Sequence, residues 1–301
     1  MQPLPFDNSV KTLAPGDVIG VAAPSSRFDP DTLDKGVERL KSMGFRVRVP
    51  RNIYETQRYL AGSDKARARV LSDLCQDPEV KAVIAARGGY GAMRMLPFLD
   101  WKDLGVSLTR FIGFSDATAL MTCLVEKSGL EVIHGPNLVS LADAGQKTLD
   151  GMKRVLTGRL EALTLCDGRC LVMGKARGRL LGGNLATLSH MVGTRFQPDL
   201  SGAIVFLEDV GEPAYKIDRM LTQMRLAGLF DRIRGVVTGD FTDCANAEYL
   251  PEIFMEIFGP LGVPVMTGLA AGHGLVNLAF PLGRTVVLDT DAARLSWSNG
   301  R

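Results

Sequence analysis

Short apolar runs alternate with helical patterns through the N-terminal half of the chain. Five such runs predict β-strands, at 18–23, 45–49, 80–86, 110–113 and 132–134. The segments between them place apolar residues at helical spacing, as at Leu33, Val37 and Leu40. Because the predicted strands are apolar on both faces, the pattern favours a parallel sheet with helices on both sides. We therefore predict an α/β domain over residues 1–140.

Polar residues and glycines mark the ends of the predicted helices. Asp29 and Asp31 are candidate caps for the first helix, and Gly44 ends it. Ser63 opens the second helix. A third predicted helix, over 116–127, begins directly after the strand at 110–113.

The pattern weakens over residues 141–170, which we interpret as an interdomain linker containing one helix. Residues 171–301 then form a second domain in this interpretation. Its predicted strands are at 179–181, 203–207, 235–238 and 263–266, and its predicted helices at 185–191, 214–226 and 249–258. The last segment, 278–297, holds β-type runs split at Gly283-Arg284 and at 289–293, which suggests antiparallel hairpins. The C-terminal domain is therefore predicted to be α+β.

Composition and charge narrow the class of partner. The chain has 301 residues, of which 46% are hydrophobic and 23% charged, as is ordinary for a globular protein. Lys and Arg number 35 against 33 Asp and Glu, so a net charge of +2 offers no electrostatic footprint for nucleic acid or an anionic membrane. No apolar run reaches the length of a membrane span, and Met1 to Val10 lack the pattern of a secretory signal. We expect a small-molecule partner.

Cysteine and histidine usage argues against disulfides and metals. Five scattered cysteines suit a reducing compartment, and the close pair Cys166 and Cys170 lacks a usual zinc or redox spacing. Three isolated histidines make a zinc site improbable. We therefore expect no metal and no cofactor.

The three histidines differ in their surroundings. His190 lies in a predicted helix, where a structural position is the simpler interpretation. His134 ends a predicted strand and either touches a ligand or merely ends that strand. His273 lies between Gly272 and Gly274, in a loop that presents its side chain with little crowding. His273 is the preferred candidate for a general base.

Ser115 follows the apolar strand at 110–113 and directly precedes a helix. This arrangement is typical of a nucleophile elbow, in which the hydroxyl is lifted out of the sheet and the next N–H, that of Asp116, points toward a developing oxyanion. The helix N-terminus adds a positive dipole end there. The alternative is that Ser115 or Asp116 merely caps the helix.

A glycine-rich loop and an acidic segment follow two other predicted strands. The loop Arg87-Gly88-Gly89-Tyr90-Gly91 exposes backbone N–H groups that suit an anion nest or a second oxyanion donor. A phosphate-binding loop is weakly supported, and a structural turn stays possible. Among the carboxylates after the strand at 203–207, Glu208 is favoured over Asp209 and Glu212 to orient an imidazole. The alternative there is a solvated acidic loop.

These candidates give a serine, an acid and a histidine in the chain order Ser115, Glu208, His273. Such a triad supports acyl transfer, usually the hydrolysis of amides or esters.

The order and spacing of these motifs resemble those of the LD-carboxypeptidases, the serine peptidase family that also contains the microcin C immunity protein. The motifs are GDVIGVAAPS at 16–25, ARGGYG at 86–91, GFSD at 113–116, LGGNL at 181–185, LED at 207–209, YKIDRML at 215–221 and GHG at 272–274. The resemblance implies a triad of Ser115, Glu208 and His273. It also implies an oxyanion hole formed by the N–H groups of Gly89 (or Gly88) and Asp116.

The resemblance further implies a fold, a substrate and an assembly. The N-terminal domain would be flavodoxin-like or amidotransferase-like, and the protein a cytoplasmic homodimer. The family's usual substrate is the muropeptide L-Ala-D-Glu-meso-diaminopimelate-D-Ala, from which the terminal D-alanine is removed in cell-wall recycling. Arg87, Gly88 and Asn184 are candidate substrate-binding residues, although capping is the simpler role for Asn184.

Two alternatives stay open at this point. The chain could be a microcin-immunity-type hydrolase of peptidyl or aminoacyl nucleotides, which needs an aromatic platform for the base. Neither Trp101 nor Trp297 lies in a loop that we connect to the site. It could also be a non-catalytic small-molecule binding protein in which Ser115 is only a helix cap.

Overall fold

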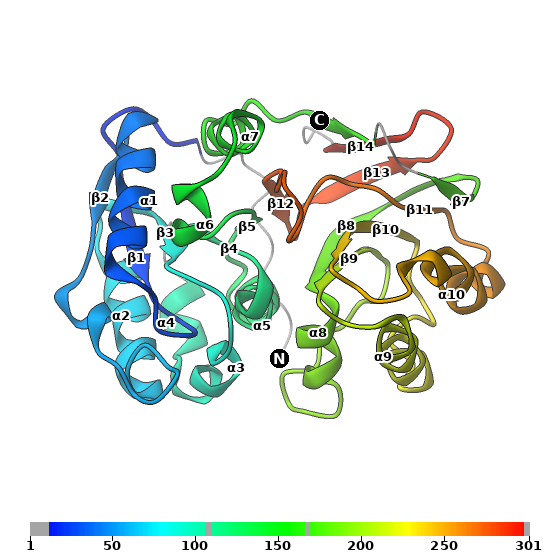
Figure 1. The fold of residues 1–301 in the computed structure, drawn as a ribbon, viewed down its shortest axis with the longest axis horizontal. Helices are drawn as coiled ribbons and strands as arrows, with labels where there is room; N and C mark the ends of the chain where they lie inside the picture. Colours follow the sequence, from blue (N-terminus) through cyan, green and yellow to red (C-terminus); the bar gives the residue numbers. More distant parts are fainter. Residues whose placement is uncertain (1–11, 106–109, 166–168, 298–301) are drawn as a thin grey trace. The chain divides into compact units, whose positions relative to one another are not determined.

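The computed structural model describes residues 12–105, 110–165 and 169–297. The first ten residues and Cys166, on which two of the sequence expectations rest, lie outside these ranges. The chain forms two compact units (Figure 1). The first unit contains Met1–Arg159 and Leu278–Pro281, and the second contains Leu160–Asn277 and Leu282–Arg301.

The first unit is built on a six-stranded sheet with the order β12-β5-β4-β3-β1-β2. Strands β1 to β5 pair in parallel wherever they are neighbours, as their two-sided apolar pattern predicts. Every predicted strand of this half is present. The strands are β1 Val18–Ala22, β2 Arg46–Arg48, β3 Val80–Ala85, β4 Arg110–Gly113, β5 Val132–His134 and β12 Phe280–Leu282.

Helices of the first unit begin at the predicted caps. The Asp29 carboxylate accepts the N–H of Thr32 at the start of α1, and the Ser63 hydroxyl accepts the N–H of Ala66 at the start of α2. The helical segments are α1 Pro30–Ser42, η1 Arg51–Tyr54, α2 Asp64–Gln76, α3 Ala92–Met95, η2 Leu96–Phe98, α4 Trp101–Gly105, η3 Ser115–Ala117, α5 Thr118–Cys123, η4 Leu124–Ser128, α6 Leu138–Ala142 and α7 Gln146–Leu156.

The second unit is built on an eight-stranded mixed sheet with the order β6-β14-β13-β8-β9-β10-β11-β7. Strands β8 to β11 pair in parallel, and the flanking pairs are antiparallel. The strands are β6 Ala162–Thr164, β7 Cys170–Val172, β8 Lys175–Asn184, β9 Ala203–Val210, β10 Gly235–Thr242, β11 Val265–Met266, β13 Thr285–Asp289 and β14 Arg294–Trp297. The helical segments are α8 Leu185–Met191, α9 Ala214–Leu226, η5 Ala247–Tyr249, α10 Leu250–Phe258 and η6 Gly259–Leu261. The predicted α+β class is confirmed.

Two sequence expectations for this half are wrong in detail. Strand β9 continues to Val210, so Glu208 and Asp209 are buried strand residues, and the solvated-loop alternative fails. Strand β12 lies beside β5 in the sheet of the first unit, so the break at Gly283 is not the turn of a hairpin. All three β12 residues are buried there. The β13–β14 hairpin is present as expected.

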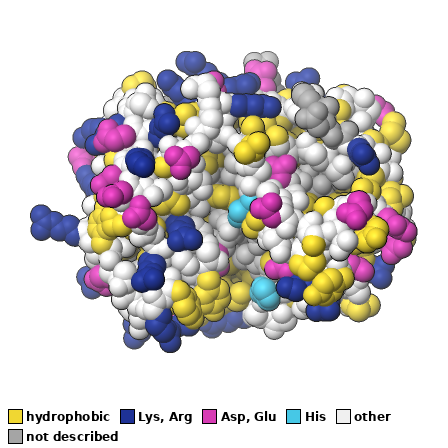
Figure 2. Space-filling view, in the orientation of Figure 1, with side chains coloured by type: hydrophobic (Ala, Val, Ile, Leu, Met, Phe, Trp, Pro, Cys, Tyr) yellow, Lys and Arg dark blue, Asp and Glu magenta, His cyan; other side chains and the backbone are white. Residues whose placement is uncertain are grey.

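The segment 141–170 contains α7, β6 and the start of β7, and the boundary between the two units falls within it. Among the described residues, no helix combines the length and apolar character that crossing a bilayer requires. On the face drawn in Figure 2, basic and acidic side chains are interspersed, in keeping with the nearly balanced charge of the sequence.

Candidate active site

Ser115 occupies a strained turn between β4 and the helix that follows. Its φ is +61°, in the left-handed region that non-glycine residues rarely adopt. The preceding Phe114 is extended, and η3 begins at Ser115 itself. An abrupt strand-to-helix turn with a strained serine is the geometry of a nucleophile elbow, whereas a simple N-cap residue has β-region angles. The local backbone therefore favours the elbow interpretation of this motif.

The glycine-rich loop after β3 contacts this turn. A Cβ added to Gly88 would lie 2.9 Å from the Ser115 Oγ and 3.7 Å from the Asp116 nitrogen, so only glycine allows the loop to pass so closely. Gly89 has a φ of +102°, and a Cβ there would meet the Ser26 hydroxyl. The Asp116 carboxylate accepts the N–H of Ala92 at 2.8 Å. The loop, the serine turn and the start of α3 are thus joined in one cluster.

A buried arginine that the sequence analysis missed stabilises this cluster. The Arg67 guanidinium, on α2, is 2% exposed and donates to the carbonyls of Pro24 and Gly91 and to the Asp64 carboxylate. Arg94 binds the same Asp64 carboxylate, at 2.8 Å. The Arg67 guanidinium therefore connects the loop after β1 to the loop after β3. An arginine within an amphipathic helix pattern gives no sequence signal for this role.

In the second unit, His273 and Glu208 are in direct contact. His273 Nδ1 lies 2.7 Å from Glu208 Oε2. The Glu208 side chain is fully buried, whereas that of His273 is 19% exposed. The other carboxylate oxygen, Oε1, has no hydrogen-bond partner among the described residues. A buried carboxylate that is left half-satisfied is uncommon and is typical of functional sites.

The two glycines beside His273 each pack against a carboxylate. A Cβ on Gly272, whose φ is +118°, would lie 2.6 Å from Glu208 Oε2. A Cβ on Gly274 would lie 2.3 Å from Asp240 Oδ2. The Gly272 N–H also donates to Asn277 Oδ1 at 3.1 Å. These glycines were expected to leave His273 uncrowded, and each of them also allows a carboxylate to approach the backbone more closely than a Cβ would permit.

Two further aspartates lie at the same end of the second sheet. The pKa of Asp240 is raised to about 6, mainly by burial and next by the nearby Glu208 carboxylate, while the Gly274 N–H and His273 oppose the shift. Burial likewise raises the pKa of Asp209 to about 6. Asp240 follows the apolar run of the strand next to β9, so the rule that found Glu208 applies equally to Asp240.

Asn184 acts within the protein. Its Oδ1 accepts the N–H of Thr187 at the start of α8, and its Nδ2 donates to Asp209 Oδ1 at 3.0 Å. Asp209 also accepts the N–H groups of Ala186 and Val210. Asn184 Oδ1 therefore caps α8, the simpler of its two candidate roles, and a contact of Asn184 with substrate stays a prediction.

The remaining histidines have structural surroundings. His134 is fully buried, stacks on Phe280 at 5.0 Å and meets Phe114 edge-on. His190 is exposed in the last turn of α8. Within the described ranges, no group of three or more His, Cys, Asp or Glu side chains is arranged to hold a metal ion.

Of the three triad candidates, the structure brings Glu208 and His273 together within the second unit, and Ser115 belongs to the first unit. What these residues offer chemically is a strained serine beside backbone N–H groups, and an imidazole oriented by a buried carboxylate. Those are the parts of a serine hydrolase.

Comparison with known proteins identifies the family. The sequence profile of the LD-carboxypeptidase N-terminal domain matches residues 19–135, and that of the C-terminal domain matches residues 177–288. The murein tetrapeptide carboxypeptidase of Pseudomonas aeruginosa is 35% identical over 93% of this chain and 94% of its own length. The chain belongs to the LD-carboxypeptidase family, as its motifs indicate. It is therefore a hydrolase of the carboxypeptidase class.

Solved structures agree with this fold. The muramoyltetrapeptide carboxypeptidase from Oxalobacter formigenes has a TM-score of 0.81 at 30% identity, covering 92% of this chain and 97% of its own. MccF in complex with glutamyl sulfamoyl guanosine has a TM-score of 0.88 at 26% identity, covering 96% of this chain and 98% of its own. The predicted fold class is confirmed.

Proposed function

We propose that this carboxypeptidase removes the terminal D-alanine from the muropeptide L-Ala-D-Glu-meso-diaminopimelate-D-Ala, with Ser115, His273 and Glu208 as its catalytic triad. The observation that carries the proposal is the 2.7 Å contact between His273 Nδ1 and Glu208. In a catalytic triad the carboxylate binds one ring nitrogen, here Nδ1, and the other ring nitrogen, Nε2, takes the proton from the nucleophile. The substrate follows from the likeness to the murein tetrapeptide carboxypeptidase of P. aeruginosa.

In the proposed reaction, His273 takes the proton of the Ser115 hydroxyl as the oxygen attacks the carbonyl carbon of diaminopimelate. The tetrahedral intermediate collapses when His273 protonates the leaving amine, which releases D-alanine and leaves an acyl-enzyme. Water, deprotonated by His273, then hydrolyses the ester. Glu208 holds the imidazole and stabilises its positive charge throughout.

The oxyanion would be bound by the N–H groups of Gly89 (or Gly88) and Asp116. Asp116 is the second residue of η3, and the first N–H groups of a helix have no intrahelical acceptor. The Gly88 backbone passes directly beside Ser115. We further propose that Arg87, next to these donors, contacts the substrate. Asn184 contributes indirectly by holding Asp209 beside Glu208.

The test is incubation of the purified protein with the tetrapeptide, followed by mass spectrometry for D-alanine and tripeptide. We expect release by the wild type and a loss of at least about 10⁴-fold in kcat for Ser115→Ala. Ser42→Ala, which alters an exposed hydroxyl at the end of α1, is the matched control. A Ser115→Ala variant that releases D-alanine at the wild-type rate would refute the assignment.

A microcin-immunity-type activity on aminoacyl nucleotides is the second candidate, because the MccF complex shares the fold. Its aromatic platform has no evident counterpart among the two tryptophans, since Trp297 is 6% exposed and Trp101 lies at the start of α4. Turnover of a glutamyl sulfamoyl nucleoside in preference to the tetrapeptide would favour this alternative.

We also propose that the protein is a cytoplasmic homodimer. Within each chain, the first unit would act as an N-terminal domain that carries the nucleophile, and the second as a C-terminal domain that carries the acid and the base. Cys123, Cys170 and Cys244 are free thiols, as is usual in a reducing compartment. Light scattering after size-exclusion chromatography tests the dimer against the chain mass of 32.5 kDa.

A further inference from the structure

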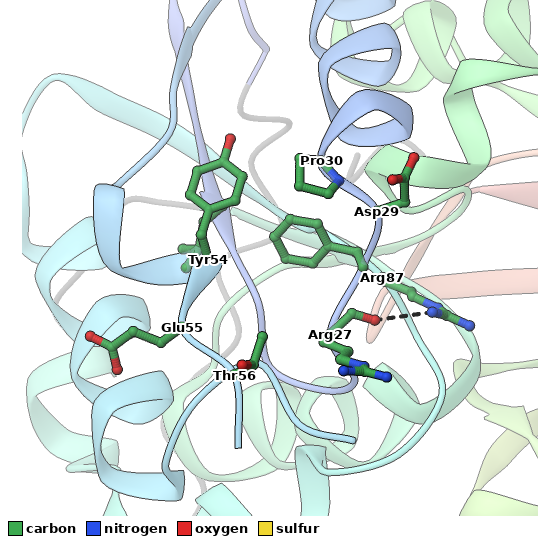
Figure 3. Close-up of a pocket in the computed structure, with 9 residues that line it drawn as sticks. Arg27, Asp29, Pro30, Tyr54, Glu55, Thr56 and Arg87 are labelled. Carbon is green, nitrogen blue, oxygen red and sulfur yellow. Dashed lines mark hydrogen bonds between the residues drawn. The ribbon is translucent and has the colours of Figure 1, made fainter. Parts of the chain in front are cut away.

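The first unit contains a hollow at the point where its strand order reverses. The chain runs from β1 to its neighbour β2 and then returns to β3 on the other side of β1. Ligands of open parallel sheets bind at such a switch point, beyond the carboxyl ends of the strands. The hollow lies between the loops that follow β1, β2 and β3, and its volume is about 430 Å³ (Figure 3). That volume is within the range of small-molecule sites.

Hydrogen bonds connect the loops that line this hollow to the loop beside Ser115. The Ser26 N–H donates to the Gly88 carbonyl, and the Ser26 hydroxyl accepts the N–H of Tyr90. Arg87, which lines the hollow, directly precedes Gly88, and Gly88 contacts Ser115. A peptide bound at Ser115 would therefore contact the loop at Gly88. The residue directly before Gly88, Arg87, lines the hollow.

Two arginines give the hollow a cationic side. Arg87 Nη1 donates to the Arg27 carbonyl at 3.0 Å, which draws the two residues together (Figure 3). Among the described ion pairs, Arg67 and Arg94 share Asp64, whereas neither Arg27 nor Arg87 takes part in one. Both side chains are exposed. Their donors are therefore available to an anion that enters from solvent.

The two carboxylates that line the hollow offset the charge of this side only in part. Asp29 is engaged as the cap of α1, where it accepts both the N–H and the hydroxyl of Thr32. In Figure 3, Glu55 lies on the opposite side of the drawn group from Arg27 and Arg87. Glu55 is thus separated from the arginines, whereas Asp29 lies on their side in Figure 3, where two cations face one carboxylate.

An aromatic pair forms the rest of the wall. The rings of Phe28 and Tyr54 meet edge-on, with centroids 5.7 Å apart. Aromatic faces provide contact area for uncharged backbone and side-chain methylene groups. A cationic side and an apolar side together fit an acidic peptide.

We propose that this hollow is a subsite for a substrate carboxylate away from the cleaved bond, held by the guanidinium groups of Arg27 and Arg87. The inference rests on the proposed function, because the tetrapeptide offers such a group: the free α-carboxylate of its D-glutamyl residue. The planar guanidinium binds carboxylates through paired N–H donors, which a lysine could not reproduce. The subsite selects peptides that are acidic upstream of the bond that is cut.

The test varies the substrate and the arginine together. One tetrapeptide carries D-glutamate, and the other carries D-isoglutamine, in which a carboxamide replaces the α-carboxylate. For the wild type we expect kcat/KM to be about tenfold higher on the acidic peptide, the effect of one charge-assisted hydrogen-bonded pair. Arg27→Gln and Arg87→Gln should each lower kcat/KM on the acidic peptide by about tenfold, mainly through KM, and change the amidated peptide by less than about twofold.

Arg51→Gln is the matched control, because Arg51 is exposed on η1 but does not line the hollow. It should keep the wild-type preference. Equal losses on both peptides, or no preference in the wild type, would overturn the subsite. If the wild type cleaves neither peptide, the proposed function fails instead. Calorimetric binding of both peptides to Ser115→Ala then decides the subsite separately, and equal affinities would refute it.

Discussion

The packing around His273 depends on the absence of a Cβ atom at the two residues beside it, Gly272 and Gly274. Gly272 and Gly274 approach the carboxyl groups of Glu208 and Asp240 more closely than any residue with a Cβ could. The base is therefore positioned by packing of backbone against acid, in addition to its own hydrogen bond. Because of this packing, a side chain added at Gly272 should disturb the base, whereas in a flexible loop it would not.

Gly272→Ala should reduce kcat by at least about 100-fold, because its Cβ would displace Glu208 and a misplaced base loses its alignment. Gly262→Ala is the matched control, since Gly262 also has a positive φ, of +63°, but has open space around it. Both variants bear backbone strain, so both melting temperatures should fall, that of Gly272→Ala further because of the clash with Glu208, while only Gly272→Ala loses activity in the D-alanine assay. Equal activity in the two variants would show that the close approach is unimportant.

The raised pKa of Asp240 makes stability depend on pH. Its pKa is about 6 in the folded protein against 3.8 for an unperturbed aspartate, so the folded state holds the proton to higher pH than the unfolded state does. Stability is therefore lost as pH rises from about 4 to about 6, because the native state binds more protons there.

Asp240→Asn removes this loss, since the amide does not ionise. The variant should gain stability relative to the wild type between pH 4 and pH 7, as measured by the shift of the urea midpoint. Asp143→Asn, at an exposed position after α6, should show no such gain. A wild-type minus variant difference that is constant over this range would contradict the assignment of the proton to Asp240.

Among the elements, α2 supports the loops of the first unit through Arg67. Arg67→Lys retains one charge but cannot reach Pro24, Gly91 and Asp64 at once. We expect a loss of about 3 kcal/mol in the free energy of unfolding, as for other broken buried ion pairs. Activity should fall too, because the Gly91 loop loses its donor. Arg69→Lys is the control, because the Arg69 side chain is 83% exposed on the same helix. It should change neither the free energy of unfolding, measured by urea titration, nor the activity in the D-alanine assay.

The elements themselves were largely predictable. Helices α8 and α9 have the predicted boundaries, because apolar spacing and polar residues agree there. Strand β9 runs beyond its predicted end. The prediction ended it too early because Glu208 and Asp209 are acidic and were therefore assigned to a loop. Strand β12 joined the other unit, a choice that depends on which core has room for it and that no local pattern encodes.

The site was predictable where chemistry follows a strand. Glu208 and His273 were paired from residue type and position, and their contact is confirmed. Asp240 was missed although it obeys the same rule, since no partner in the sequence drew attention to it. Arg67 and Asn277 act through buried hydrogen bonds to the backbone groups of Gly91 and Gly272, and no pattern of residue types in the sequence marks such contacts.

At the scale of the whole molecule, the proposed chemistry needs groups from both units. Ser115 belongs to the first unit, and Glu208 and His273 belong to the second. A serine hydroxyl alone is a weak nucleophile and reacts with a fluorophosphonate only when a base activates it. The reactivity of Ser115 therefore reports on a residue that is 158 positions away in the sequence, at His273.

We expect a fluorophosphonate to label Ser115 in the wild type, as identified by peptide mass spectrometry, and His273→Ala to slow this labelling by at least about 100-fold, since activation is lost with the base. His190→Ala, which removes an exposed histidine of the same unit, should label at the wild-type rate. A cooperative melt of each variant establishes that any loss of labelling comes from the missing base and not from unfolding. Labelling of Ser115 that persists in His273→Ala would mean that another group activates the serine, and the proposed triad would have to be abandoned.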